Sequence, residues 1–231
     1  MIRVLQATAL LVVVGIASTP ELRGQTITSP YEFVDTRHEA GFFVAHVPGN
    51  RGDLRMGPGG GTLTGLRYAF EVTGPFALEV GGFLLPTDRV VRVPQDGGIE
   101  DIGSSDALIA ALDGRIRFSL PGRRTWHGLA PFLQAGGGLA LDFRGGSELE
   151  AEIPSSLRFS FGPSFLGVMG AGTRWLPTDN LTVRLDLSTY FWKLGTPDEF
   201  LQLGEAELGR FVPQQEWTPV PSFSLGLSYR F

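Results

Sequence analysis

The chain has 231 residues and a mass of 25.0 kDa, which is enough to enclose a core in one domain or two small ones. Its net charge is −5 and Lys193 is its single lysine, so we exclude a nucleic-acid-binding protein, which would be expected to be basic. The absence of cysteine excludes disulfides, thiolate metal sites and cysteine nucleophiles. The hydrophobic content of 42% is too high for a disordered chain.

Residues 1–24 have the pattern of a secretory signal peptide. Arg3 precedes an apolar run over residues 7–17, which is shorter than the about 20 residues that a transmembrane helix needs. Small residues favour cleavage after Ala17 or after Gly24. A buried N-terminal helix is the alternative. We therefore expect an exported protein whose single domain covers residues 25–231.

Beyond residue 24, apolar residues alternate with polar or small ones, which is the period of a β-strand. Most of the segments with this period have ten or more residues, matching the about 9–11 residues of a tilted membrane strand. The sequence predicts eight strands, over residues 38–47, 62–72, 76–85, 107–120, 129–143, 161–176, 181–192 and 222–231.

The connections between these strands alternate in length. Those over residues 73–75, 121–128 and 177–180 are short, whereas those over residues 48–61, 86–106, 144–160 and 195–219 are long. Short turns at one end and long loops at the other are typical of outer-membrane barrels. An even number of strands also places both termini at the end with the short turns.

One face of each predicted strand carries charged residues, six bases and five acids in total. Arginine pairs well with carboxylates in a confined space, so we expect these side chains to form an ionic network that occludes a narrow lumen. The alternative is the solvated outer face of a soluble β-sandwich. The predicted lumen residues are Arg67, Glu71, Glu79, Asp113, Arg115, Arg117, Asp142, Arg174, Arg184, Asp186 and Arg230.

Aromatic residues cluster near the strand ends, as the aromatic girdles of a membrane barrel would. They are Trp126, Trp175, Tyr190, Trp192, Tyr229 and Phe231. The last strand ends with phenylalanine after alternating apolar residues, and this ending resembles the C-terminal signal that outer-membrane proteins present to the barrel assembly machinery. Tyr229 and Phe231 would carry that signal.

With its signal peptide and hairpin spacing, the chain resembles the small bacterial outer-membrane β-barrel family, which includes OmpA-like and OmpX-like transmembrane domains. The resemblance implies an all-β, eight-stranded, antiparallel up-and-down transmembrane β-barrel in the cell outer membrane. It also implies contact with outer-membrane lipid and lipopolysaccharide, and with the assembly machinery during biogenesis. We expect a monomer.

The sequence contains little that indicates chemistry. His38 and His46 are about 26 Å apart along one strand and His127 lies in a short turn, so we expect no metal site and no cofactor. His46 could approach Ser104, Ser105 and Asp106 as in lipid-modifying barrels, but no spacing supports this. The glycine-rich segment 57–61 lacks the lysine of a phosphate loop. We therefore expect no enzyme.

The long loops over residues 86–106, 144–160 and 195–219 carry thirteen acidic residues against five basic ones. They form either a solvated surface or a surface that binds divalent cations. Thr196, Pro197 and Glu199 have the spacing of a capping box, which predicts a short helix as far as Leu208. Its apolar residues would close the barrel mouth, bind a partner or pack locally.

The predicted function is a non-enzymatic outer-membrane barrel with an envelope-structural or surface-contact role through its long acidic loops. The alternative is a narrow channel or carrier for a small, apolar solute. Small residues at inward positions favour that alternative, namely Gly81, Gly136, Gly138, Gly170, Gly172 and Gly226. A lipid-modifying enzyme is the third hypothesis.

Overall fold

A computed structural model describes residues 29–95, 98–144, 148–202 and 211–231. The predicted signal peptide lies outside these residues and stays a prediction. The elements are β1 (Tyr31–Phe33), β2 (His38–Val47), β3 (Gly61–Thr73), β4 (Phe76–Gln95), β5 (Gly98–Ser119), β6 (Arg124–Trp126), β7 (Leu129–Asp142), α1 (Glu148–Ala151), β8 (Ser164–Trp175), β9 (Leu181–Gly195) and β10 (Gln215–Arg230). No helix among the described residues is long and apolar enough to cross a membrane.

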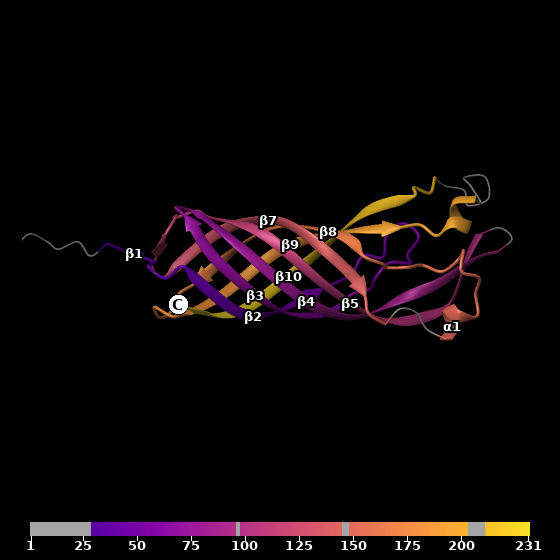
Figure 1. The fold of residues 1–231 in the computed structure, drawn as a ribbon, viewed down its shortest axis with the longest axis horizontal. Coiled ribbons are helices and arrows are strands. Elements are labelled where there is room, and N and C mark those ends of the chain that lie inside the picture. Colours follow the sequence, from indigo (N-terminus) through magenta and orange to yellow (C-terminus); the bar gives the residue numbers. More distant parts are fainter. Residues whose placement is uncertain (1–28, 96–97, 145–147, 203–210) are drawn as a thin grey trace, which may run out of the picture.

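Eight long strands form a closed antiparallel barrel (Figure 1). Each long strand pairs with the next one along the chain, and β10 pairs with β2 to close the ring. Closure satisfies the backbone groups that an open sheet would leave at its edges. The predicted eight-stranded, up-and-down barrel is confirmed.

The two ends of the barrel differ, as the connection lengths predicted. At the turn end, β3 and β4 are joined through Gly74 at φ +51°, and the first described strands and the C-terminus lie at this end as well (Figure 1). His38 and Phe231 exchange two backbone hydrogen bonds there, of 3.2 and 3.0 Å. The long connections β2–β3, β7–β8 and β9–β10 and the far ends of β4 and β5 gather at the opposite end, which we call the loop end.

The prediction of an irregular loop over residues 86–106 is wrong. β4 and β5 continue as a two-stranded arm beyond the barrel, and their pairing extends to Gln95 opposite Gly98, with a shift of register between Val91 and Arg92 (Figure 1). The strands were predicted from apolar alternation, which this segment lacks because charged residues such as Arg89 take inner positions on it. At the turn end, the segment predicted as a simple turn contains β6, which pairs with β1.

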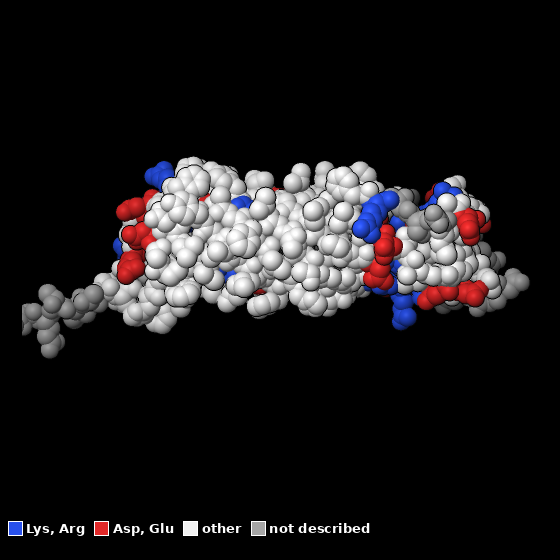
Figure 2. Space-filling model, turned by 90° about the horizontal axis from the view of Figure 1, so that it is seen from below, with Lys and Arg blue, Asp and Glu red and all other residues white. Residues whose placement is uncertain are grey.

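Side chains alternate between a buried inner face and an exposed outer face on every long strand. The outer face is apolar: Leu66 and Leu112 are each 70% exposed and Phe165 is 61% exposed. Figure 2 shows a broad band of the barrel surface that is nearly free of charged side chains, with charged residues at its two ends. This arrangement is the inverse of that in a water-soluble β-protein and suits a hydrocarbon surrounding.

Candidate functional site

The lumen contains two zones with different chemistry. The ionic zone lies in the half of the barrel near the turn end, and its charged side chains come from every long strand except β7 and β10. Its charged members are Glu39, Arg67, Glu71, Glu79, Asp113, Arg115, Arg117, Arg174, Arg184 and Asp186.

Glu79 is the centre of the ionic zone. One of its oxygens accepts hydrogen bonds from Arg117 at 2.6 Å and from Arg184 at 2.7 Å, and the other lies 3.7 Å from Nε of Arg67. Arg184 and Arg67 also donate to Asp186, at 2.8 and 3.1 Å. The Glu79 side chain is 1% exposed, so its charge is balanced by these guanidinium groups and not by solvent.

A second cluster lies beside the first and extends it toward the turn end. Arg117 donates to Glu71 at 2.5 Å, and Arg174 donates to both Glu71 and Glu39, at 3.1 and 3.2 Å. Glu39 is 7% exposed and was not among the predicted lumen residues. Its position on the face that also carries Phe43 could have identified it, because that face is the inner face of β2.

Polar neutral side chains connect the ionic zone to the rest of the lumen. Arg115 makes two hydrogen bonds to Asp113, at 2.6 and 3.0 Å, and a third to the hydroxyl of Tyr190 at 3.2 Å. Arg184 donates to Gln134 at 2.8 Å, and its guanidinium lies 4.3 Å from the ring centre of Phe132. The charges therefore have both ionic and aromatic neighbours, and the network spans the lumen.

Two of the predicted lumen residues lie outside this zone. Arg230 is 5% exposed and donates to the carbonyl of Thr178 at 2.7 Å and to the hydroxyl of Thr36 at 3.4 Å. Asp142 lies near the loop end, 3.5 Å from Nε of Arg89. The structure thus brings nine of the eleven predicted residues into one network and places the other two at the lumen's opposite ends.

The second zone, which we call the apolar zone, fills the half of the lumen near the loop end. Phe43, Leu63, Phe83, Ile109, Leu166, Tyr190 and Trp192 are among its buried members. The rings of Phe83 and Trp192 are 6.4 Å apart in an edge-on arrangement, and those of Tyr190 and Trp192 are stacked at 6.0 Å. The expectation of a uniformly polar lumen is therefore wrong for this half.

The aromatic prediction is also partly wrong. Tyr190 and Trp192 were predicted at the outer ends of strands facing the membrane interface, but each is only 2% exposed and lies inside the barrel. Trp126, Trp175, Tyr229 and Phe231 are each at least half exposed. Alternation along β9 places Trp192 on the same inward face as Arg184. The prediction of an outer position was wrong because it used only the aromatic character of Trp192 and its place near the strand end.

A buried ion pair fixes the β7–β8 connection over the loop end. Arg89 of the hairpin arm makes two hydrogen bonds to Glu150 of α1, at 2.7 and 3.0 Å, and a third to the carbonyl of Phe159 at 2.9 Å. Arg89 is 3% exposed and Glu150 is 5% exposed. Both were expected in solvated acidic loops, so the loop end is more ordered than the charge count suggested.

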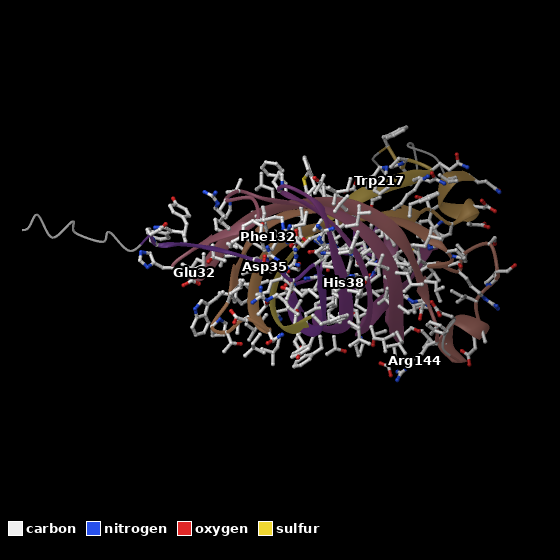
Figure 3. The ribbon with its side chains drawn as sticks, turned by 60° about the vertical axis from the view of Figure 1, so that its left-hand side comes forward. Glu32, Asp35, His38, Phe132, Arg144 and Trp217 are labelled. Atoms are coloured by element: carbon white, nitrogen blue, oxygen red, sulfur yellow. The ribbon has the colours of Figure 1, made fainter. Side chains whose placement is uncertain are left out.

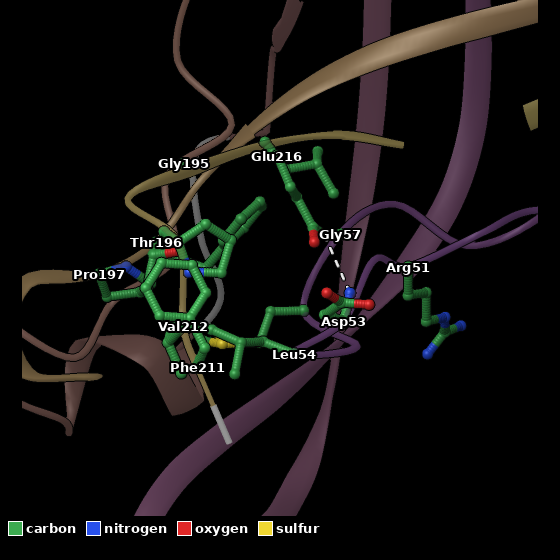
Figure 4. Close-up of a pocket in the computed structure, with 14 residues that line it drawn as sticks. Arg51, Asp53, Leu54, Gly57, Gly195, Thr196, Pro197, Phe211, Val212 and Glu216 are labelled. Carbon is green, nitrogen blue, oxygen red and sulfur yellow. Dashed lines mark hydrogen bonds between the residues drawn. The ribbon is translucent and has the colours of Figure 1, made fainter. Parts of the chain in front are cut away.

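A small pocket of about 20 Å³ opens beside this ion pair at the loop end (Figure 4). It is lined by apolar side chains that include Leu54, Met56, Leu194 and Phe211. Glu216 lies at its edge and accepts hydrogen bonds from the backbone N–H of Asp53 at 2.9 Å and from the hydroxyl of Thr218 at 3.2 Å. The pocket is therefore mainly apolar, with polar groups at the edge.

The predicted capping box near this pocket does not form. The Thr196 hydroxyl donates to the carbonyl of Pro213 at 2.6 Å, and the N–H of Glu199 is directed to the carbonyl of Ser156 at 3.3 Å. Residues 198–202 are helical nonetheless, and the remainder of the predicted helix lies outside the described residues. Phe200 is fully buried and packs on the apolar zone at its loop-end side.

The histidines and loop serines do not assemble a catalytic site. His46 is exposed on the outer face of β2, whereas Ser104, Ser105 and Asp106 belong to β5, and β3 and β4 lie between these strands. Ser105 faces inward and donates to Glu150 at 3.5 Å. No group of three His, Asp or Glu residues within the described part of the chain could hold a metal ion.

His38 and the residues proposed as an assembly signal meet at the turn end. Nδ1 of His38 is 2.6 Å from the hydroxyl of Tyr68, and its ring stacks on Phe231 with centres 5.6 Å apart. Tyr229 and Phe231 stack at 6.4 Å and are exposed on the outer surface. The terminal strand therefore presents an aromatic surface, as such a signal would require.

The inward glycines do not leave an open channel. A Cβ added at Gly138 would collide with the carbonyl oxygen of Leu112, and one added at Gly136 would collide with that of Gly114. β5 and β7 approach so closely there that only glycine fits. At these two positions the small residue therefore reflects close strand packing and is no evidence for a wide pore.

No known protein family matches the sequence, and no curated protein is detectably similar to it. Solved structures do match. The outer-membrane protein OprG from Pseudomonas aeruginosa has a TM-score of 0.53 at 13% identity, with 88% of this chain and 99% of that chain covered. Neisserial surface protein A has a TM-score of 0.50 at 14% identity, covering 88% and 98%. The chain therefore has the fold of a small outer-membrane β-barrel.

Proposed function

We propose that the protein is an outer-membrane barrel with a closed lumen that acts without catalysis, through the surface at its loop end. Its role is then structural, in the cell envelope, or one of contact with the surroundings of the cell. The observation that carries this proposal is the filling of the lumen, by ion pairs in one half and by aromatic side chains in the other.

The loop end supports a role in contact. The Arg89–Glu150 pair holds the β7–β8 connection against the hairpin arm, so this end presents a defined surface. Acidic side chains remain exposed on it, at 55% for Asp101 and 82% for Asp106. With β1 and the C-terminal Phe231 at the turn end, the loop end would face outward from the cell, as the long loops of outer-membrane barrels do.

Two measurements test the proposal. Expression with the signal sequence in a Gram-negative host should place the protein in the outer-membrane fraction, in a compact form that changes its migration on an SDS gel only after boiling. In planar bilayers, the purified barrel should show no steady conductance. A soluble periplasmic product would contradict membrane insertion, and stable ion channels would contradict a closed lumen.

The second candidate function is that of a carrier for a small apolar solute. It is favoured by the apolar lining of the pocket beside the apolar zone, which would have to widen from its volume of about 20 Å³ to admit a solute. An apolar fluorescent dye such as N-phenylnaphthylamine should then bind the wild type, and Met56→Glu should weaken its binding severalfold. Equal dye binding by the wild type and by Met56→Glu would remove this candidate.

A further inference from the structure

A hollow lies on the outer face of the barrel, in the band without charged residues. It encloses about 1930 Å³, part of it open to the surroundings, and crosses the strands from β2 to β7. Gly82 and Ala110 lie in its floor, and Leu66, Leu112, Leu139 and Phe143 are among its walls. A second hollow of about 930 Å³ shares Leu66, Gly82 and Leu112 with it and continues toward Tyr68 at the turn end.

The shape of the hollow follows from one cross-strand row. Gly82 pairs with Leu66 on one side and with Leu112 on the other, and both leucines are 70% exposed. Leu112 leans over Gly82, where its Cδ2 lies 2.9 Å from the position that a Cβ would take, and Leu66 projects on the other side. The hollow is therefore bounded by flexible leucine side chains, to which a single hydrocarbon chain can fit more closely than a second barrel.

A positively charged side chain, that of Arg144, lies at the end of the hollow nearest the loop end. Phe143 lines the hollow and Arg144 follows it, pointing away from the barrel (Figure 3). The Arg144 guanidinium lies 3.3 Å from Asp106, and the two side chains are 57% and 82% exposed. Asp106 and Ala110 lie on the same outward row of β5, four residues or about 13 Å apart.

We propose that this surface binds one anionic membrane lipid, with an acyl chain in the hollow and its head-group phosphate on Arg144. The proposal rests on the proposed membrane location. A guanidinium recognises phosphate through paired hydrogen bonds, and the apolar walls match hydrocarbon. The distance from Ala110 to Asp106 approaches half the thickness of a hydrocarbon core, which is about 30 Å. A lipid with its acyl chain at Ala110 can therefore place its phosphate at Arg144, beside Asp106.

The cysteine-free chain permits a direct test. A bimane fluorophore on Leu139→Cys reports on the hollow, and one on Leu187→Cys, also exposed on the outer face, reports on bulk lipid. Each labelled barrel is placed in phosphatidylcholine vesicles that contain brominated phosphatidylglycerol or, at the same mole fraction, brominated phosphatidylcholine. Quenching at Leu139→Cys should favour phosphatidylglycerol by up to about fivefold, the effect of one basic group on an anionic lipid. Quenching at Leu187→Cys should show no preference.

Variants separate the contributions of head group and chain. Arg144→Gln should abolish the preference, whereas Asp106→Asn should increase it by releasing the guanidinium. Arg124→Gln, at an exposed arginine near the turn end, should leave it unchanged. Ala110→Phe should fill the hollow and lower quenching by both lipids, whereas Ala135→Phe, on the outer face of β7 and outside the hollow, should not.

Equal quenching by the two lipids at Leu139→Cys, or a preference that survives Arg144→Gln, would overturn the proposal. Each variant is also examined for a heat-dependent shift on an SDS gel. If the wild-type band shifts on heating but the protein shows no lipid preference, only the proposed lipid site is contradicted. A wild type that neither inserts nor shifts contradicts the proposed function itself.

Discussion

The two halves of the lumen are filled in different ways. In the ionic zone, charged side chains are held by directional hydrogen bonds. Glu79, for example, has three arginine neighbours. In the apolar zone, rings such as Phe83 and Trp192 pack without directional partners. The difference teaches that the stability of the ionic zone depends on which groups are paired, whereas the stability of the apolar zone depends on how much volume the side chains fill. The same substitution should therefore have different consequences in the two halves.

The largest effect is expected from Glu79→Leu. It removes the shared acceptor of Arg117 and Arg184 and leaves buried guanidinium groups without their carboxylate. Breaking a buried ion pair from one side costs about 3 to 5 kcal/mol. Urea unfolding of the barrel in lipid vesicles measures this loss, and Glu100→Leu on the exposed hairpin arm is the control. An unchanged free energy of unfolding would refute the central role of Glu79.

Arg89→Leu should have the next largest effect, about 3 kcal/mol, because the buried Glu150 loses its arginine partner but keeps the hydrogen bond from Ser105. The change should release the β7–β8 connection from the hairpin arm. Limited proteolysis of intact vesicles would then cut within residues 143–163 faster than in the wild type. A cleavage rate equal to that of the wild type would show that this ion pair does not hold the connection.

Phe83→Leu replaces one apolar side chain of the apolar zone by another. It should lower the free energy of unfolding by about 1 kcal/mol, because the zone can repack around a side chain of the same class. Comparing it with Glu79→Leu in the same unfolding assay tests the contrast between the halves directly, since both positions lie on the inner face of β4. Equal losses at the two positions would mean that the halves do not differ in tolerance.

The smallest effect is expected from Arg51→Gln. Arg51 and Asp88 form a 2.7 Å ion pair at the loop end, with side chains 27% and 48% exposed. Pairs this accessible contribute about 0.5 kcal/mol, and salt screens them. The difference between variant and wild type in urea should therefore shrink further at high ionic strength. A loss that persists in high salt would point to packing by Arg51.

The sequence predicts the strands of this barrel well, because alternation along a strand is a direct consequence of its geometry. The two-residue period along β9 identified both Arg184 and Asp186 as inward. It could not reveal the apolar zone, since inward residues there are as hydrophobic as outward ones. Trp192 was misassigned for this reason, although its parity with Arg184 was visible.

Contacts between distant segments were beyond prediction from the sequence. Arg89 and Glu150 are separated by 61 positions, and neither lies in a regular pattern that would identify it as buried. The hairpin arm escaped prediction because its strands pair only with each other beyond the barrel. The glycines at 136 and 138 were visible in the sequence, but only the closeness of β5 and β7 shows why they are there.

The seam between β2 and β10 has a consequence for the order of assembly. It joins residues between 177 and 191 positions apart, from His46 opposite Phe223 to Glu39 opposite Arg230, whereas most other pairings link strands adjacent in the chain. Contacts of such large sequence separation are slow to form, because the intervening chain must first be ordered. Adjacent hairpins should therefore form early and the seam last, so that a growing barrel remains an open sheet until β10 docks.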